Sequence, residues 1–174
     1  MRPATSVCPG CGLELPGTEP SRVEDSAFDA SPGCLDLYGE VIAYGMAHPA
    51  LLARWHQTCT DAYRLQHLTP STKPITTAFA LNSLYLVLER GFTGIQSREA
   101  HGRLANTVTT WPRFTPAPSA GDVTVFDVAM AGTPEEHGDL VRRWGCSVWA
   151  AWSHVHAEVA EMTDRQLHGW HPTS

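Results

Sequence analysis

Apolar side chains recur every three or four positions along most of this chain, which is the spacing of amphipathic α-helices. Ser31-Pro32 is a strong helix start, because serine caps the first amides and proline at the first helical position loses no needed donor. Pro49 restarts the pattern, and Pro70 and Pro74 end it. The pattern predicts helices over residues 32–46, 49–68, 75–90 and 96–109.

The segment 75–90 differs from the others because it is apolar almost all round, so we expect it at the centre of the fold. Gly91 directly after it is a natural helix stop. Residues 111–118 are rich in proline and are predicted as a loop. Residues 123–130 fit either a short strand or a short helix.

A last helix is predicted from the start signal Thr133-Pro134-Glu135-Glu136, which combines a cap, a proline and two acids at the positive end of the helix dipole. Its apolar spacing continues to about Met162. Three tryptophans follow that spacing, and a stripe of this kind is more often core than a cofactor site. They are Trp144, Trp149 and Trp152.

The N-terminal segment carries the motif Cys8-Pro-Gly-Cys11-Gly12. A tight turn of this composition aims two thiolates at one ion, which is typical of a zinc knuckle. The rest of this segment has no sustained periodicity of apolar residues. We therefore predict a mainly α fold, an irregular helical bundle with an N-terminal zinc-knuckle arm, divided into an arm over 1–30, a bundle domain over 31–165 and a C-terminal tail over 166–174.

Length and composition indicate one packed core, since the chain has 174 residues, of which 43% are hydrophobic. The formal net charge of −6 argues against nucleic-acid binding, which needs clustered Lys and Arg. No apolar run approaches the roughly 20 residues that span a bilayer, and residues 1–7 lack the apolar region of a signal peptide. We expect a cytoplasmic protein that does not bind membranes.

Tetrahedral zinc needs two ligands besides Cys8 and Cys11. Cys34 is the best third ligand, because the first turn of a helix favours a thiolate. For the fourth we favour His67, at the end of the predicted second helix; the weaker choices are His56, Cys59 and Cys146. Two other readings stay open: Cys8 and Cys11 as a redox pair or as idle thiols, and Cys34 as a small buried apolar residue.

A polar face runs along the second predicted helix, where His56, Cys59, Tyr63 and His67 are spaced by three or four residues. Asp61 stands close enough along the chain to join an adjoining pocket. The face either packs beside the zinc as hydrogen-bonding groups or lines a cavity for acid-base chemistry or a second metal. Candidates opposite it are Asn82, His137, His154 and His156. The predicted catalytic set is Asp61, His56 and His137.

The recurring elements of the chain also resemble a family. They are Cys8-Pro-Gly-Cys-Gly12, Ser31-Pro-Gly-Cys34 with the segment to Glu40, Asp61 to His67, Leu86 to Gly91, Glu136-His137, Leu140 to Arg142, and the tryptophans of the last helix. In these residues the chain is similar to an uncharacterised family of small bacterial proteins, a domain of unknown function that begins with Cys-Pro-x-Cys-Gly.

The resemblance implies that five candidate residues occupy positions shared across that family: Cys34, Asp61, Gln66, His67 and His137. It supplies no activity. The chain departs from the family pattern at Leu35, where tryptophan is usual, at Leu68, where proline is usual, and at Asn82, where histidine is expected. If that histidine binds a catalytic metal in relatives, this chain has lost the activity or altered it.

These observations favour a zinc-binding helical protein whose small-molecule pocket is built from His56, Asp61, His67 and the last helix, such as a metal-assisted hydrolase, lyase or cyclase. One alternative is a non-catalytic module in which zinc is structural and the acidic surface meets a protein partner. The other is a thiol redox protein with a reversible disulfide between Cys8 and Cys11.

Overall fold

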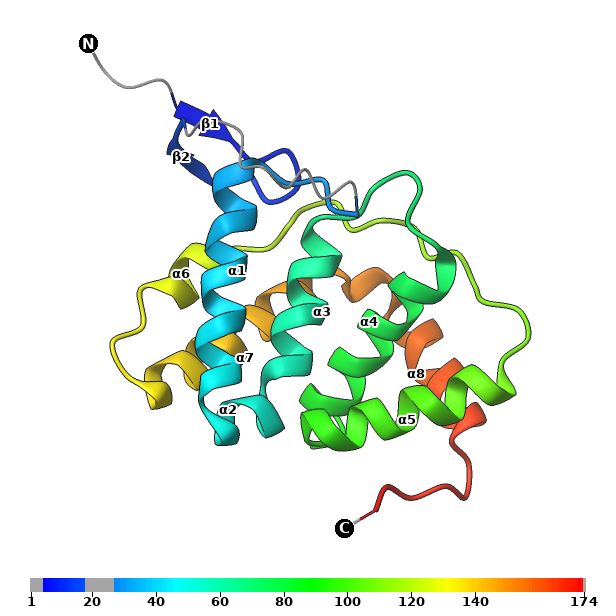
Figure 1. Ribbon diagram of the computed structural model, residues 1–174. Helices are drawn as coiled ribbons and strands as arrows, with labels where there is room; N and C mark the ends of the chain where they lie inside the picture. The colour runs from blue at the N-terminus through cyan, green and yellow to red at the C-terminus, as the bar shows by residue number, and fades with distance from the viewer. Residues whose placement is uncertain (1–4, 18–26, 174) are drawn as a thin grey trace.

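The computed structural model describes residues 5–17 and 27–173 as a bundle of helices with a short hairpin at one end (Figure 1). Residues 18–26 of the predicted irregular arm, and residues 1–4 and 174, lie outside the described residues. The helices are α1 Pro32–Ala47, α2 Pro49–Arg54, α3 His56–Gln66, α4 Pro74–Leu88, α5 Gly94–Thr107, α6 Val125–Ala129, α7 Pro134–Ala151, the 3-10 turn η1 Ser153–Val155 and α8 His156–Gln166. The predicted mainly α fold with a Cys-bearing arm is confirmed.

The hairpin consists of β1 Thr5–Val7 and β2 Glu14–Pro16, which pair antiparallel with Ser6 opposite Leu15. These strands are too short to show the alternation that identifies a strand in a sequence, and they were not predicted. Figure 1 places the hairpin beside the N-terminal end of α1. The cysteine turn between the strands faces the bundle.

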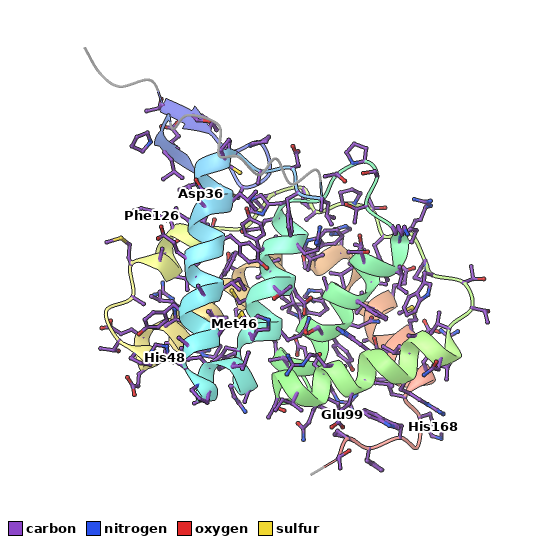
Figure 2. All side chains as sticks on the ribbon, in the orientation of Figure 1. Asp36, Met46, His48, Glu99, Phe126 and His168 are labelled. Carbon is purple, nitrogen blue, oxygen red and sulfur yellow. The ribbon has the colours of Figure 1, made fainter. Side chains whose placement is uncertain are left out.

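The bundle is organised around α3 and α4, which pack against each other and are covered by α1, α5, α7 and α8. Helix α4 is buried on nearly every side, as its apolar sequence predicts, with Leu81 and Leu84 fully enclosed. The stripe of tryptophans on α7 also lies in the core, where Trp144 and Trp152 are among the largest fully buried side chains. Side chains fill the space between these helices (Figure 2).

The helix predicted over 49–68 is interrupted at Trp55, which separates α2 from α3. At this bend the chain makes two close contacts with glycines on other helices. The backbone oxygens of Ala53 and Arg54 lie so near Gly94 that a Cβ there would come within 3.1 Å of both, and the Trp55 ring lies 3.1 Å from the Cβ position of Gly138. Packing against two glycines on other helices is a tertiary effect, which local spacing does not reveal.

The helix predicted from 133 to 162 is likewise divided, into α7, η1 and α8. Its carbonyls near the break find side-chain partners: Nε2 of His156 lies 2.8 Å from the Trp149 oxygen, and the two rings stack at 3.7 Å. Nearby, Nε2 of His154 lies 2.9 Å from the oxygen of Thr115 in the proline-rich loop. These histidines therefore support the helix break and the loop.

Residues 123–130, left open between strand and helix, form α6, which begins with a capping box made by Thr124 and Asp127. Beyond α8, Trp170 returns to the bundle, with its ring centroid 6.5 Å from that of Phe92. In the described part of the chain, every helix is too short or too polar to cross a membrane.

Candidate metal centre and candidate pocket

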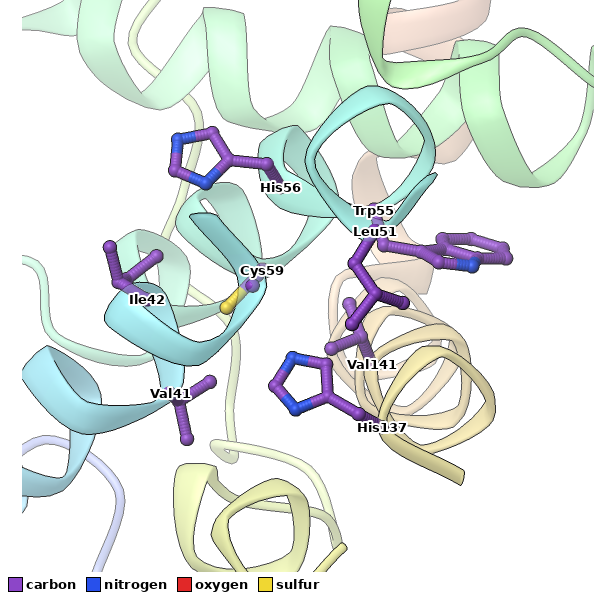
Figure 3. A pocket seen from close by; sticks show the side chains of 9 residues that line it. Val41, Ile42, Leu51, Trp55, His56, Cys59, His137 and Val141 are labelled. Carbon is purple, nitrogen blue, oxygen red and sulfur yellow. The ribbon is translucent and has the colours of Figure 1, made fainter. Parts of the chain in front are cut away.

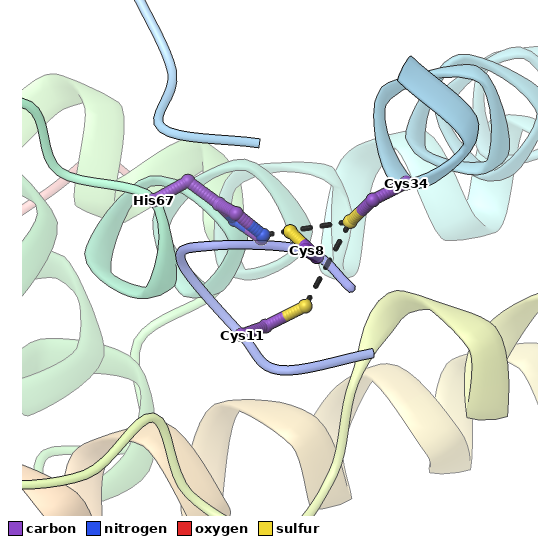
Figure 4. A group of neighbouring side chains, drawn as sticks. All are labelled: Cys8, Cys11, Cys34 and His67. Atoms are coloured by element: carbon purple, nitrogen blue, oxygen red, sulfur yellow. Dashed lines mark hydrogen bonds between the residues drawn. The ribbon is translucent and has the colours of Figure 1, made fainter. Parts of the chain in front are cut away.

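Four side chains with soft or imidazole donors meet where the hairpin touches the bundle (Figure 4). Cys8 and Cys11 come from the turn between β1 and β2, Cys34 from the first turn of α1, and His67 from the residue that ends α3. These are the three cysteines and the favoured histidine of the sequence prediction. All four donor atoms lie within 4.8 Å of one another, so the cluster could hold a metal ion.

The spacing of the donors fits tetrahedral zinc. Zinc bonds of about 2.3 Å to sulfur and about 2.05 Å to nitrogen give tetrahedron edges of about 3.8 Å between two sulfurs and about 3.6 Å between sulfur and nitrogen. Sγ of Cys11 and Sγ of Cys34 are 3.8 Å apart, and Sγ of Cys34 lies 3.4 Å from Nε2 of His67. The four side chains therefore have the donor types, the number of donors and the donor separations that tetrahedral zinc requires.

The turn that carries the two hairpin cysteines has little freedom. The Cys8 amide donates to the oxygen of Leu13, and the Gly12 amide donates to the oxygen of Cys8, each at 2.9 Å. Gly12 has φ +76°, a left-handed conformation that glycine adopts without steric cost. The turn is thus closed by its own backbone, with both thiols aimed to one side.

Gly10 allows this turn to sit directly on the end of α3. A Cβ at Gly10 would lie 2.5 Å from the backbone oxygens of Asp29 and Gln66 and 2.6 Å from Cδ2 of His67. Only a residue without a side chain permits this approach. The requirement could not be seen in the sequence, where Gly10 is one of many glycines.

Further hydrogen bonds orient the donors. Nδ1 of His67 lies 2.7 Å from the backbone oxygen of Tyr63, so Nδ1 carries the proton and Nε2 is free to face the sulfurs. The Ser31 amide donates to Sγ of Cys8 at 3.4 Å, and the Tyr63 hydroxyl donates to Sγ of Cys34 at 3.7 Å. Such donors stabilise thiolates, and an outer layer of this kind is typical of protein metal sites.

The electrostatics of the cluster also favour a cation. Hydrogen bonds from Cys11 and Cys34 lower the pKa of Cys8, while the same close packing of sulfurs, together with burial, raises the pKa of Cys34. Burial acts to lower the pKa of His67, but hydrogen bonds with the Cys11 and Cys8 thiols outweigh it and raise the pKa to about 9. Three adjacent thiolates need a divalent ion to offset their charge, and binding it would displace the protons.

A second group of candidates, His56, Cys59 and His137, lies between α1, α3 and α7 (Figure 3). These residues line a cavity of about 10 Å³ that is otherwise apolar, enough for the centre of about one water molecule. His137 also lines an adjoining cavity of about 160 Å³, together with Glu40 and Tyr44. Burial lowers the pKa of both His56 and His137, which favours the neutral form of both imidazoles.

Asp61, the third member of the predicted catalytic set, does not face these cavities. Its carboxylate accepts hydrogen bonds from Nε2 of Gln57 at 3.1 and 3.0 Å, and it is 5% exposed. Burial raises the pKa of Asp61 to about 7, against the smaller opposing effects of hydrogen bonds from Ser83 and Gln57. The structure thus separates Asp61 from His56 and His137, and it places His67 in the Cys3His cluster.

Two further candidates from the sequence, Asn82 and Cys59, have their side chains in the core. Asn82 accepts a hydrogen bond from the Thr163 hydroxyl at 2.9 Å, and Cys59 is buried, which raises the pKa of its thiol to about 12.

Glu40 and Tyr44, which line the larger cavity, were not predicted as pocket residues. Their spacing of four on α1 puts them on one face, which is the signal that could have indicated them.

Gln66 was expected only from the family resemblance, and its side chain makes three hydrogen bonds. Its Nε2 donates to the backbone oxygens of Ala120 at 2.7 Å and Val123 at 2.9 Å, and its Oε1 accepts from Nε1 of Trp144 at 2.9 Å. This one amide joins the end of α3 to the loop before α6 and to α7.

Comparison with known proteins gives one match. The model of a family of unknown function, DUF5946, matches residues 6–153, a stretch that contains the four clustered Cys and His residues, the His137 cavities and all of α7. No curated protein and no solved structure matches the chain.

Proposed function

We propose that this chain, which belongs to the family of unknown function DUF5946, binds one zinc ion and uses it to hold the N-terminal hairpin on the helical bundle. The observation that carries the proposal is the donor geometry: sulfurs 3.8 Å apart and sulfur to imidazole nitrogen 3.4 Å, close to the edges of a zinc tetrahedron. The ligands come from three segments that are far apart in sequence. The ion would therefore fix their mutual positions.

A structural role fits this coordination better than a catalytic one. Cys3His supplies all four ligands that tetrahedral zinc takes, whereas catalytic zinc has three protein ligands and an open position for water or substrate. Cys8, Cys34 and His67 are each at most 1% exposed and only Cys11 among the four is half-buried, so a substrate could approach the ion on the Cys11 side alone. Zinc of this kind contributes folding free energy directly.

Metal analysis tests the proposal with two matched variants. Purified, reduced protein should contain one zinc per chain, and Cys34→Ser should lose it with a lower Tm. Cys146→Ser makes the same chemical change at an exposed cysteine outside the cluster and should keep both zinc and Tm.

Metal-free reduced protein with an unchanged fold and Tm would refute the structural role. Recovery of a Cys8 to Cys11 disulfide in place of zinc would favour the redox alternative.

A second candidate function, binding of a small molecule, is supported by a specific observation. His137 is 4% exposed, its imidazole makes no hydrogen bond with any described residue, and it stands between the cavities of about 10 and about 160 Å³. In the described part of the chain, the ring nitrogens of His137 are not among the fully enclosed polar atoms that lack a partner, so the ring borders open space. A ligand in the larger cavity could therefore supply a hydrogen-bond partner.

An enzymatic version of this candidate, such as a hydrolase, lyase or cyclase, would depend on His56 and His137, because Asp61 is bound by Gln57 elsewhere. Two neutral imidazoles beside one cavity could act as general base and hydrogen-bond donor. Loss of ligand binding in His137→Gln, with zinc content retained, would separate this function from the metal centre. Unchanged ligand binding in that variant would show that His137 is not part of the binding site, and absence of ligand binding by the parent protein would favour the non-catalytic, partner-binding module.

A further inference from the structure

We propose that the larger cavity beside His137 binds a small organic ammonium ion, an amine carried on a short alkyl chain. The inference deepens the second candidate function above, and it rests on His137 having a ligand. It adds the chemical class of that ligand, which follows from the charge, the hydrogen-bonding groups and the size of the cavity.

The position of His137 supports a binding site in this cavity. The imidazole lies in the second turn of α7 and is almost fully buried, yet no described residue satisfies its ring nitrogens. Its nearest aromatic neighbour is Tyr44, with ring centroids 4.9 Å apart. Burial, reinforced by His48, lowers the pKa of His137, which favours the neutral ring, and a neutral imidazole has one nitrogen with a free lone pair. That nitrogen can accept a hydrogen bond from an ammonium group.

The charge around the cavity favours a cation over an anion. Glu40 is the charged side chain in its lining, beside His137 and otherwise apolar or aromatic groups. Residues 32–47 and 123–141, which supply α1, α6 and the first half of α7, contain six Asp or Glu and no Lys or Arg. A wall with one sign of charge attracts ligands of the opposite sign and repels carboxylates and phosphates.

The positive end of the α7 dipole could offset this field, but acids already meet it. Glu135 and Glu136 lie in its first turn, and a carboxylate oxygen of Glu136 accepts from the Gly132 amide at 2.8 Å. The N-terminal end of α7 therefore offers no competing anion site beside the cavity.

The size and apolar lining of the cavity limit the rest of the ligand. About 160 Å³ is open to the centres of water-sized molecules, and Val41, Val128 and Ala129 line it with Tyr44. Drug-sized molecules usually occupy 300–1,000 Å³, so a ligand of a few carbons fits this space better. The ammonium would bridge Glu40 and His137 while the alkyl chain lies on the apolar wall.

Nuclear magnetic resonance of the zinc-loaded full chain tests the proposal. The protein is titrated with n-butylammonium chloride and, at equal ionic strength, with sodium butyrate and with n-butanol. The ammonium should shift the His137 ring and the Ala129 and Ala131 amides with a saturating dependence on concentration, while butyrate and butanol leave them unchanged.

Two exposed acids on α1 provide matched variants. Glu40→Gln removes the carboxylate from the cavity and should weaken butylammonium binding about fivefold, the upper range for a partly exposed ion pair. Asp36→Asn removes the same charge from α1 outside the cavity lining and should leave the affinity within about twofold. Because both residues are exposed, neither variant should disturb folding.

Each other outcome overturns the proposal in a distinguishable way. If butyrate or butanol shifts His137 at least as strongly as the ammonium, the ligand class is wrong while the pocket stands. If none of the three shifts His137, both the ammonium and the ligand-binding function fail. Equal weakening by Glu40→Gln and Asp36→Asn would indicate non-specific attraction to the acidic face.

Discussion

Gly10→Ala should weaken zinc binding and lower stability, although it adds only one methyl group and removes no ligand. The new Cβ would lie 2.5 Å from the oxygens of Asp29 and Gln66 and 2.6 Å from the His67 ring. Restoring even 3.0 Å requires a shift of 3.0 − 2.5, or 0.5 Å, between the cysteine turn and the end of α3. Zinc sites keep ligand distances within about 0.2 Å, so the strained turn cannot keep both cysteines and His67 at bonding distance.

The expected cost follows from overpacking a tight contact, which is about 1–3 kcal/mol. If the metal-free protein releases this strain by letting the turn move away, the whole cost appears in the zinc affinity, as a decrease of about 5- to 150-fold. Competition with a chromophoric chelator measures the affinity, and thermal unfolding with and without zinc measures the associated stability.

Gly39→Ala is the matched control for this substitution. Gly39 lies inside α1, and a Cβ there would meet nothing within 4 Å. Alanine should leave zinc affinity unchanged and raise stability by about 0.5–1 kcal/mol, because glycine weakens a helix interior. Parental zinc affinity in Gly10→Ala would show that the turn does not rest on α3 and would refute the reasoning.

Three further predictions concern the metal, Asp61 and Gln66. Chelation of zinc should accelerate hydrogen exchange at residues 5–17, measured at the Cys8 and Gly12 amides, while the amides of α4 stay protected; equal acceleration in both regions would mean that the bundle itself depends on the ion. Because Asp61 has a folded pKa of about 7 against an ordinary value of 3.8, the folded state binds the extra proton and stability falls as pH rises from about 4 to 7. Asp61→Asn should therefore be more stable than the parent at pH 8 by on the order of 2 kcal/mol, a gain that urea unfolding should find mostly lost at pH 5. Gln66→Leu should cost roughly 2 kcal/mol or more in urea unfolding, since it leaves the buried Nε1 of Trp144 without an acceptor; a smaller loss than for Gln57→Leu would contradict this ranking.

The helices could be predicted because their signals are local. Apolar spacing with prolines and caps located α1, α4, α5 and the start of α7 to within two residues, and all-round apolarity indicated that α4 is central. The interruptions at Trp55 and after Ala151 could not be predicted. Glycines on other helices permit the bend at Trp55, and His156, just after the second break, contacts the Trp149 oxygen; such contacts leave no periodic signal.

The four side chains of the Cys3His cluster were predictable for a different reason. Cys-x-x-Cys restricts two donors to one turn, and Cys34 and His67 stand at helix ends, where side chains from separate elements can meet. The pocket was less predictable, because helical spacing places Asp61 near His56 along the chain without fixing which neighbour it faces. In the structure Gln57, four residues before it, takes the carboxylate.

The end of α3 links the Cys3His cluster to the other half of the chain. His67 contributes its imidazole to the cluster, and its backbone oxygen accepts from the Asp29 amide at 3.0 Å, while the adjacent Gln66 bonds to the loop before α6 and to Trp144. Two consecutive residues thus attach the hairpin on one side and α7 on the other. Because α7 also carries His137, an ion that fixes the end of α3 contributes to the position of the cavity wall. A purely structural zinc would in this way still support whatever the cavity binds.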